Sequence, residues 1–315
     1  MGGYIAMIKE SLAVVLTIFM LIPSLFFPKA PAEPSIVPLD AENLQAQFSV
    51  VSDIHLDIYW DESYVNRYTM LRKGLQDMAS TAKPNDLFMS IGDNVEDAQI
   101  IEYASLYLYL KLYNKLPNTM IAMGNHETFK SETFAPDLAS FLTSYNLYTG
   151  EKRKTSYYHK VINGYYYIVM GTEDKVGDQE YISPAQLEWL DKTMAEAAAT
   201  GKPIFLFNHQ IFEGTHSNNW DAGSIGEQND AVYAIVSKYE DVFYFSGHLH
   251  HSLNETTYQT TPEGVHLLNL PSFGKDGIQG QGFQVEIYPD RVVMRARNFG
   301  EGKWIADYEI TQRLD

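Results

Sequence analysis

The 315-residue chain contains no cysteine. This absence excludes disulfide bonds, zinc sites built from thiolates and cysteine nucleophiles. Basic residues are also scarce, because 23 lysines and arginines stand against 40 aspartates and glutamates and leave a net charge of −17. A surface this acidic repels phosphate backbones, so we expect no nucleic acid as the main partner.

Internal repeats and low-complexity tracts are absent as well, and no second linker rich in proline or glycine divides residues 41–315. Apolar residues make up 45% of the chain and charged residues 20%, which is typical of globular proteins and excludes intrinsic disorder. We therefore expect one large domain over residues 47–315. The oligomeric state is left open.

The N-terminus carries a single apolar segment, from Leu12 to Phe27, with Lys9 before it. This pattern predicts a secretory signal peptide over residues 1–32. An uncleaved membrane anchor is the alternative, although Pro23 interrupts the segment and a spanning helix needs roughly 20 apolar residues. In both cases we expect an exported protein, secreted or tethered to the outer face of the membrane. The prolines that follow predict an extended tether over residues 33–46.

Short apolar runs alternate with helical patterns along the rest of the chain. The helical periodicity covers residues 63–82, and a second helix rich in leucine and tyrosine is expected to end near Leu116. A third helix is expected to begin at Ser183-Pro184, and Asn163-Gly164 predicts a hairpin turn. The order of βα units first and β hairpins last indicates a layered α/β domain with mixed sheets. The runs that predict the strands before the hairpins cover residues 47–52, 86–91, 119–123, 203–207 and 242–246.

Polar residues follow each of these five strands. Because ligands of α/β sheets bind at the carboxyl ends of strands, the five segments are expected to meet at one site. Alternation along an extended strand end predicts that side chains two residues apart, as in the first and last segments, point the same way. The five segments are Asp53-Ile54-His55, Gly92-Asp93-Asn94, Gly124-Asn125-His126-Glu127, Asn208-His209 and Gly247-His248-Leu249-His250.

The residue types in these segments indicate metal binding. Histidine and carboxylate ligands without sulfur suit divalent transition metals such as Mn, Fe or Zn. Seven candidate ligands exceed what one ion needs, so a bridging carboxylate between two ions is expected. Those candidates are Asp53, His55, Asp93, Asn125, His209, His248 and His250.

The ordered set of segments resembles the motifs of the calcineurin-like metallophosphoesterase superfamily, over residues from about 47 to 270. The resemblance implies a sandwich of two mixed β-sheets flanked by helices, and two divalent metal ions. It implies that Asp53, His55 and His250 hold one metal ion. It further implies that Asn125, His209 and His248 hold the other ion, that Asp93 bridges the two, and that His126 is the catalytic residue beside them.

The implied chemistry is hydrolysis of a phosphate ester. Two metal ions lower the pKa of a bridging water, so that hydroxide attacks phosphorus, and His126 stabilises the transition state or protonates the leaving oxygen. Glu127 is a candidate for orienting His126 or a ligand. Asn94 is a candidate for substrate contact, although a turn residue is an equal alternative. His216 and Trp220 lie in a long loop and are further candidates for substrate contact.

Departures from the family patterns narrow the expected activity. The residues after Asp93 include no arginine of the kind that protein Ser/Thr phosphatases carry, and Glu96 stands where purple acid phosphatases have a tyrosine ligand. The remaining branch hydrolyses small phosphodiesters and other phosphate esters, so we expect an exported phosphodiesterase with a small phosphate-ester substrate. A phosphomonoesterase that scavenges phosphate is one alternative, and a non-catalytic surface binding module with the same fold is another.

Overall fold

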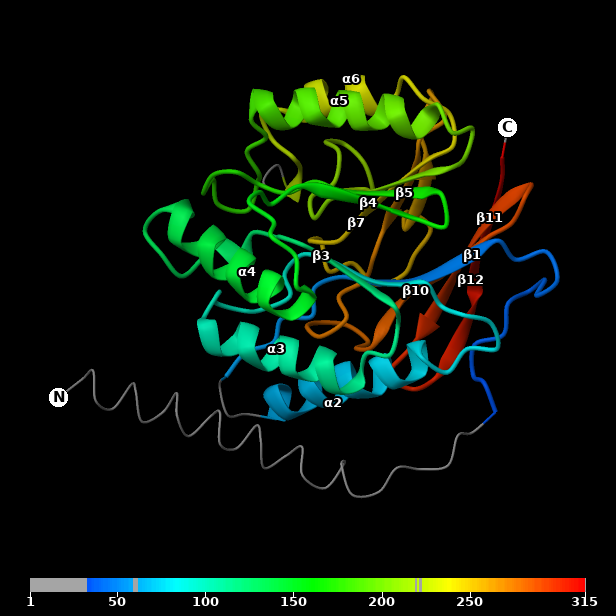
Figure 1. Ribbon diagram of the computed structural model, residues 1–315, viewed down its shortest axis with the longest axis horizontal. Coiled ribbons are helices and arrows are strands. Elements are labelled where there is room, and N and C mark those ends of the chain that lie inside the picture. Colours follow the sequence, from blue (N-terminus) through cyan, green and yellow to red (C-terminus); the bar gives the residue numbers. More distant parts are fainter. Residues whose placement is uncertain (1–32, 59–61, 219, 221–222, 315) are drawn as a thin grey trace.

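The computed structural model describes residues 33–58, 62–218, 220 and 223–314, and these residues form four layers (Figure 1). Two six-stranded β-sheets face each other in the middle, α2 and α3 lie outside the first sheet, and α5 and α6 lie outside the second. The predicted sandwich of two mixed sheets flanked by helices is confirmed. The helices are α2 (Glu62–Met78), α3 (Ile100–Tyr113), α4 (Phe134–Thr149), α5 (Pro184–Ala198) and α6 (Asn229–Val236).

Both sheets are mixed: the parallel strands form one half of the first sheet and the centre of the second. The first sheet has the order β12-β11-β10-β1-β2-β3 and is parallel from β1 to β3, while the second has the order β4-β5-β6-β7-β9-β8 and is parallel from β5 to β9. Every strand predicted above lies within one residue of its expected bounds. The strands are β1 (Ala46–Val51), β2 (Leu87–Ile91), β3 (Asn118–Ala122), β4 (Tyr158–Ile162), β5 (Tyr165–Val169), β6 (Ile204–Phe207), β7 (Val242–Ser246), β8 (Tyr258–Thr260), β9 (His266–Asn269), β10 (Gln281–Ile287), β11 (Arg291–Asn298) and β12 (Lys303–Arg313).

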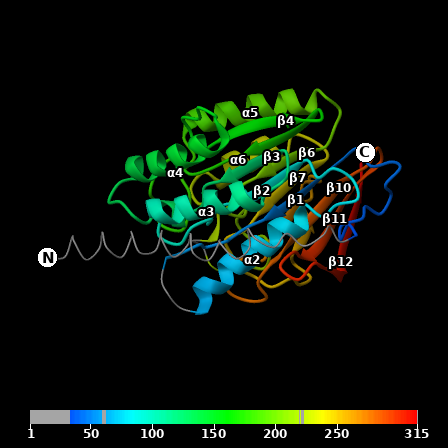
Figure 2. The same cartoon turned by 60° about the horizontal axis from the view of Figure 1, so that its bottom comes forward.

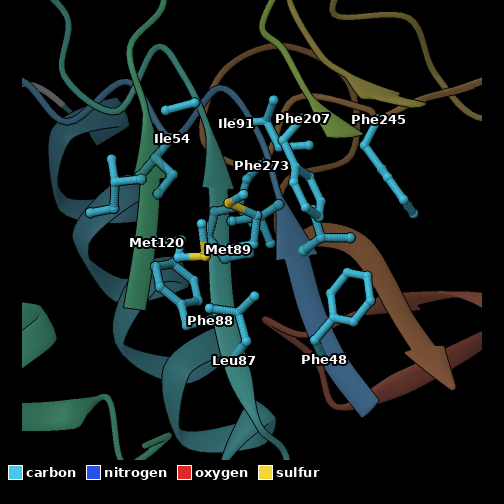
Figure 3. Packing of buried hydrophobic residues seen from close by; sticks show 14 of the residues in the cluster. Phe48, Ile54, Leu87, Phe88, Met89, Ile91, Met120, Phe207, Phe245 and Phe273 are labelled. Atoms are coloured by element: carbon cyan, nitrogen blue, oxygen red, sulfur yellow. The ribbon is translucent and has the colours of Figure 1, made fainter. Parts of the chain in front are cut away.

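Aromatic side chains fill the space between the two sheets. Phe48 of β1 meets Phe205, Phe207, Phe245 and Tyr167 of the second sheet edge-on, with ring centroids 5.2–6.0 Å apart. Figure 3 shows Phe48, Phe207 and Phe245 turned into this space. Edge-to-face pairs add about 0.5–1.5 kcal/mol each to the burial of apolar surface. This packing fixes one sheet against the other, and with it the strand ends that precede the polar segments.

A second core lies between the second sheet and its helices (Figure 2), where Leu190 and Met194 of α5 are fully buried. The helix begins as predicted, with the Ser183 hydroxyl accepting from the backbone N–H of Gln186. The Gln186 side chain does not close a capping box, because it is bonded to the backbone of Gly171 instead.

Residues 33–45 are fastened to the body of the protein rather than hanging from it, and residues 39–43 form turns. Ile36 is fully buried, its N–H donates to Ser80, and its carbonyl accepts from Ala82. Because residues 80–82 are engaged in these bonds, α2 ends at Met78, four residues before the predicted end. Among the described residues, no helix is long and apolar enough to cross a membrane. The predicted signal peptide lies outside the described residues.

Candidate metal centre

The five polar segments meet where β1, β2, β3, β6 and β7 end. The alternation argument assumed an extended backbone at these strand ends, but the backbone there is not extended. Five of the seven predicted ligands lie in the left-handed region, which costs a residue with a side chain about 1–3 kcal/mol. His248 and His250 consequently turn toward different ligand groups instead of pointing the same way. The five residues and their φ angles are Asp53 (56°), His55 (50°), Asp93 (48°), His248 (70°) and His250 (52°).

Two glycines allow these turns to approach one another. A methyl group on Gly124 would collide with the backbone and carboxylate of Asp93, and one on Gly247 would collide with Ser52 and Asp53. Glycine is therefore required at both positions for close packing.

The predicted ligands form two groups that share Asp93. The first cluster comprises Asp53, His55, Asp93 and His250, and the second comprises Asp93, His209 and His248; within each, one ligand atom per residue lies within 4.8 Å of all the others. In the first cluster, His250 Nε2 lies 3.1 Å from Asp53 Oδ1 and 3.0 Å from His55 Nε2. In the second, His209 Nε2 lies 3.1 Å from Asp93 Oδ2.

Outer partners orient three of the histidine rings. His209 Nδ1 lies 2.7 Å from the Ile91 carbonyl oxygen, and His250 Nδ1 lies 2.7 Å from the Asp276 carboxylate. His55 Nδ1 lies 3.2 Å from the Glu96 carboxylate. In each ring Nδ1 faces outward and Nε2 faces the cluster, which is the arrangement of a metal-binding histidine with its tautomer fixed from behind.

The charges at the site favour a cation. Burial lowers the pKa of His55, but the carboxylates of Asp53 and Glu96 outweigh it and raise that pKa to about 9. Burial likewise opposes the charge on His209, yet Asp93 and Asp53 raise its pKa to about 10. Burial would raise the pKa of Asp93, and the histidines beside it hold that pKa well below its usual range. The carboxylates therefore stabilise positive charge in a buried site. Divalent metal ions would supply such charge.

Asn125 fits the second cluster as a neutral oxygen ligand. Its Nδ2 donates to Asp178 Oδ1 at 3.1 Å, which leaves Oδ1 turned away from that partner. Oδ1 is buried and has no hydrogen-bond partner among the described residues. A buried amide oxygen without a partner is costly unless something binds it, and a metal ion meets that need. The donors present thus fit two divalent ions, held by the first cluster and by the second cluster with Asn125.

His55, Glu96 and His126 form a third group of possible ligands, but we assign it to the surroundings of the two clusters and not to a third metal ion. Glu96 Oε1 lies 2.6 Å from Lys275 Nζ and Glu96 Oε2 lies 3.0 Å from Arg67, so two cations already balance its charge. His126 Nδ1 lies 2.6 Å from the Glu96 carbonyl oxygen, and its Nε2 lies 3.9 Å from Asp93 Oδ2. The His126 ring therefore borders both clusters without belonging to either.

Glu127 acts on the backbone rather than on His126. Its two carboxylate oxygens accept from the N–H groups of Gly124, Asp93, Asn94 and Val95, at 2.6–3.3 Å. Burial and the neighbouring Asp93 raise the pKa of Glu127 to about 7. The residue thus ties the segment after β2 to the segment after β3.

Two of the remaining candidates are buried and do not line the cleft at the two clusters. Asn94 is fully buried and donates to the Ala122 carbonyl, which matches its alternative as a turn residue. His216 is also buried, its Nδ1 lies 2.7 Å from the Thr256 carbonyl oxygen, and burial lowers its pKa to about 4. Both side chains therefore support loops.

A cleft of about 340 Å³ opens onto the two clusters and His126. Among its other walls, only Trp220 is a site residue predicted from the sequence. Leu249 lies inside the last polar segment but is apolar, and Asp178, Lys275 and Asp276 lie in loops outside the five segments. A larger cavity of about 610 Å³, between Phe212 and Tyr233, is lined by none of the predicted site residues. Besides the ligands and His126, the cleft is lined by Asp178, Trp220, Leu249, Lys275 and Asp276.

Comparisons with known proteins bear on the family and the fold. The sequence model of the calcineurin-like phosphoesterase family matches residues 46–252. A search of curated proteins finds no matching sequence. Among solved structures, a dimetal phosphatase from Danio rerio is similar with a TM-score of 0.67 at 13% identity, covering 86% of this chain and 100% of that one. The protein TT1561 of Thermus thermophilus is similar with a TM-score of 0.44 at 14% identity, covering 86% of this chain and 99% of that one.

The family match spans most of the chain and contains all five ligand segments. With the shared Asp93 and the two clusters around it, the match accounts for the fold, the divalent-metal ligands and the hydrolysis of phosphoric esters. The chain belongs to the calcineurin-like phosphoesterase family.

Proposed function

We propose that this protein is an exported phosphodiesterase that hydrolyses small phosphodiesters at a centre of two divalent metal ions. The observation that carries the proposal is the position of Asp93, whose carboxylate is within 4.8 Å of the ligand atoms of both clusters. One carboxylate common to two ligand sets is what a centre with two ions about 3.5–4 Å apart requires.

When bound, the two ions supply an activated water and bind the phosphoryl oxygens. The protein itself positions the His126 ring. Because Nδ1 of His126 faces the Glu96 carbonyl, Nε2 is the ring atom that faces the centre. The backbone N–H of His126 also donates to Asp93 Oδ1 at 2.9 Å, which fixes the ring relative to the shared carboxylate. Because the Glu96 carbonyl accepts from Nδ1, Nε2 carries a proton only in the imidazolium form, which burial disfavours by lowering the pKa of His126. In that form the Nε2 proton faces the centre and can pass to the leaving oxygen.

The charges of the cleft support a diester over a monoester. Asp178 and Asp276 line the cleft, and Lys275 is paired with Glu96. No arginine is among the described residues that line it. A monoester presents two negative charges near neutral pH and a diester presents one, so these carboxylates repel the monoester more strongly.

The deciding experiment compares two substrates on the full chain loaded with Mn²⁺. We expect faster hydrolysis of bis(p-nitrophenyl) phosphate than of p-nitrophenyl phosphate. We also expect His126→Ala to lose about 10²- to 10⁴-fold in kcat while keeping its metal content. Faster hydrolysis of the monoester would support the phosphate-scavenging alternative, and no hydrolysis of either ester would support the non-catalytic binding module.

Export is proposed from the apolar N-terminal segment alone. N-terminal sequencing of secreted material is expected to begin near Glu33. Recovery of the chain in the membrane fraction with Met1 intact would instead indicate an anchor.

A further inference from the structure

We infer that Trp220 is the substrate-specificity residue of the cleft, and that it stacks on a planar aromatic ring carried by the phosphodiester. This inference rests on the proposed function and names the class of substrate. A nucleobase and a simple aryl group share the required chemistry, since both present a flat π-face.

The indole of Trp220 lies at the metal centre with much of its surface uncovered. It stacks on the ring of His248, with centroids 5.1 Å apart and planes 22° apart. It also lines the cleft that opens onto Asp93 and His126. Trp220 nevertheless exposes 46% of its surface. A tryptophan that served only to pack against a ligand histidine would bury most of its apolar area.

Hydrogen bonds from Asn218 and Gly223 hold the backbone of Trp220. Asn218 Oδ1 accepts from the Trp220 N–H at 3.0 Å, and Asn218 Nδ2 donates to the Trp220 carbonyl at 2.7 Å. The N–H of Gly223 donates to the same carbonyl at 2.9 Å. A methyl group on Gly223 would lie within 3.0 Å of both Trp220 and Leu249, so these side chains press against that glycine. With its backbone held by these bonds and its ring stacked on His248, Trp220 offers a stacking surface at little further cost in conformational entropy.

The walls of the cleft are mostly charged or polar, with two apolar residues among them. Lys275, Asp276 and Asp178 lie among its charged and polar walls, whereas Trp220 and Leu249 are its apolar ones. The phosphoryl group belongs with the metal ligands. An organic substituent of the ester gains most from the apolar wall, where its water is displaced by the indole and the leucine.

The test uses binding as well as turnover. The full Mn²⁺-loaded chain and its Trp220→Ala, Trp220→Phe and Trp189→Phe variants are titrated with diphenyl phosphate, the methyl ester of adenosine 5′-phosphate, and diethyl phosphate. Affinity is measured by competition against bis(p-nitrophenyl) phosphate and by quenching of tryptophan fluorescence. Trp189 is the matched control, because it lies on α5 against Tyr157 and His159. Metal content is measured for every variant.

We expect one or both planar esters to bind about tenfold more tightly than diethyl phosphate in the parent chain. Trp220→Ala should lose that preference with unchanged metal content, Trp220→Phe should keep part of it, and Trp189→Phe should keep all of it. Quenching by planar esters should disappear in Trp220→Phe. Preference for one planar ester identifies the ring as nucleobase or aryl.

Two results would overturn the inference: equal affinity for planar and aliphatic esters, or an equal loss for all three esters in Trp220→Ala together with loss of metal. The second result would mean that the indole only positions His248. Failure of the proposed function is distinguishable, because quenching by planar esters would then persist in a chain that hydrolyses no diester.

Discussion

The two ligand clusters differ in what stands behind their ligands. In the first cluster a carboxylate lies behind each of two histidines, Glu96 behind His55 and Asp276 behind His250. In the second, a neutral backbone carbonyl lies behind His209. A carboxylate behind an imidazole raises its basicity and strengthens the metal bond. The first cluster should therefore hold its ion more tightly, and the second should release its ion first.

The largest effect is expected where the clusters meet. Asp93→Asn removes the charge that both clusters share, so we predict that fewer than two ions remain bound and that turnover is abolished. The variant should stay folded, because an asparagine can still accept from the His126 N–H. Elemental analysis, circular dichroism and a diesterase assay check these points. Two bound ions with full turnover would show that Asp93 does not bridge.

Glu127 holds the backbone around Asp93, and its replacement is expected to have the second-largest effect, on the free energy of unfolding. Glu127→Ala leaves several buried N–H groups without an acceptor, at about 1–3 kcal/mol each. We predict that it lowers the free energy of unfolding by at least about 3 kcal/mol in metal-free protein. Denaturant unfolding measures this, with the exposed Glu188→Ala on α5 as control. A loss below about 1 kcal/mol would contradict the role given to Glu127.

Metal titrations of two outer-partner variants test the difference between the clusters directly. Asp276→Asn should weaken the tighter of two binding steps by about tenfold, because it removes the charge behind His250. Asp178→Asn should affect mainly the looser step, because Asp178 contacts Asn125 of the second cluster. Calorimetry with Mn²⁺ separates the two steps. If Asp276→Asn changed only the looser step, the assignment of the tighter site would be reversed.

Sequence patterns predicted the sheets and the meeting of the five polar segments, but not the outer partners. Apolar runs and glycines mark strand ends, so Asp93 and His209 could be placed at one site without any contact information. The direction of the ligand side chains could not be predicted, because it depends on left-handed turns that the sequence does not announce at Asp53 or His250. Asp276 and Lys275 were missed because long-range folding, rather than spacing, brings them to the cleft.

Two glutamates, Glu96 beside the metal centre and Glu102 on α3, have pKa values shifted in opposite directions, and Glu102 gives the smallest predicted effect. His55 and Lys275 hold the pKa of Glu96 well below its usual range against the effect of burial. Burial raises the pKa of Glu102 at the start of α3 to about 8, and nearby Asp97 and Asp57 add to the rise. The folded chain therefore keeps a proton on Glu102 that the unfolded chain releases above its ordinary pKa of about 4.5.

The contribution of Glu102 to the free energy of unfolding should consequently fall as the pH rises from about 4.5 to about 8. In Glu102→Gln no proton is released at that position, and the glutamine oxygen can still accept from the N–H groups of Asp97 and Gln99. We predict that this variant gains stability relative to the parent as the pH rises across that window, and that the two converge below about pH 4.5. Urea unfolding at about pH 4.5, 6 and 8 measures the difference. A constant difference at all three values would show that Glu102 is already charged in the fold, as Glu96 is.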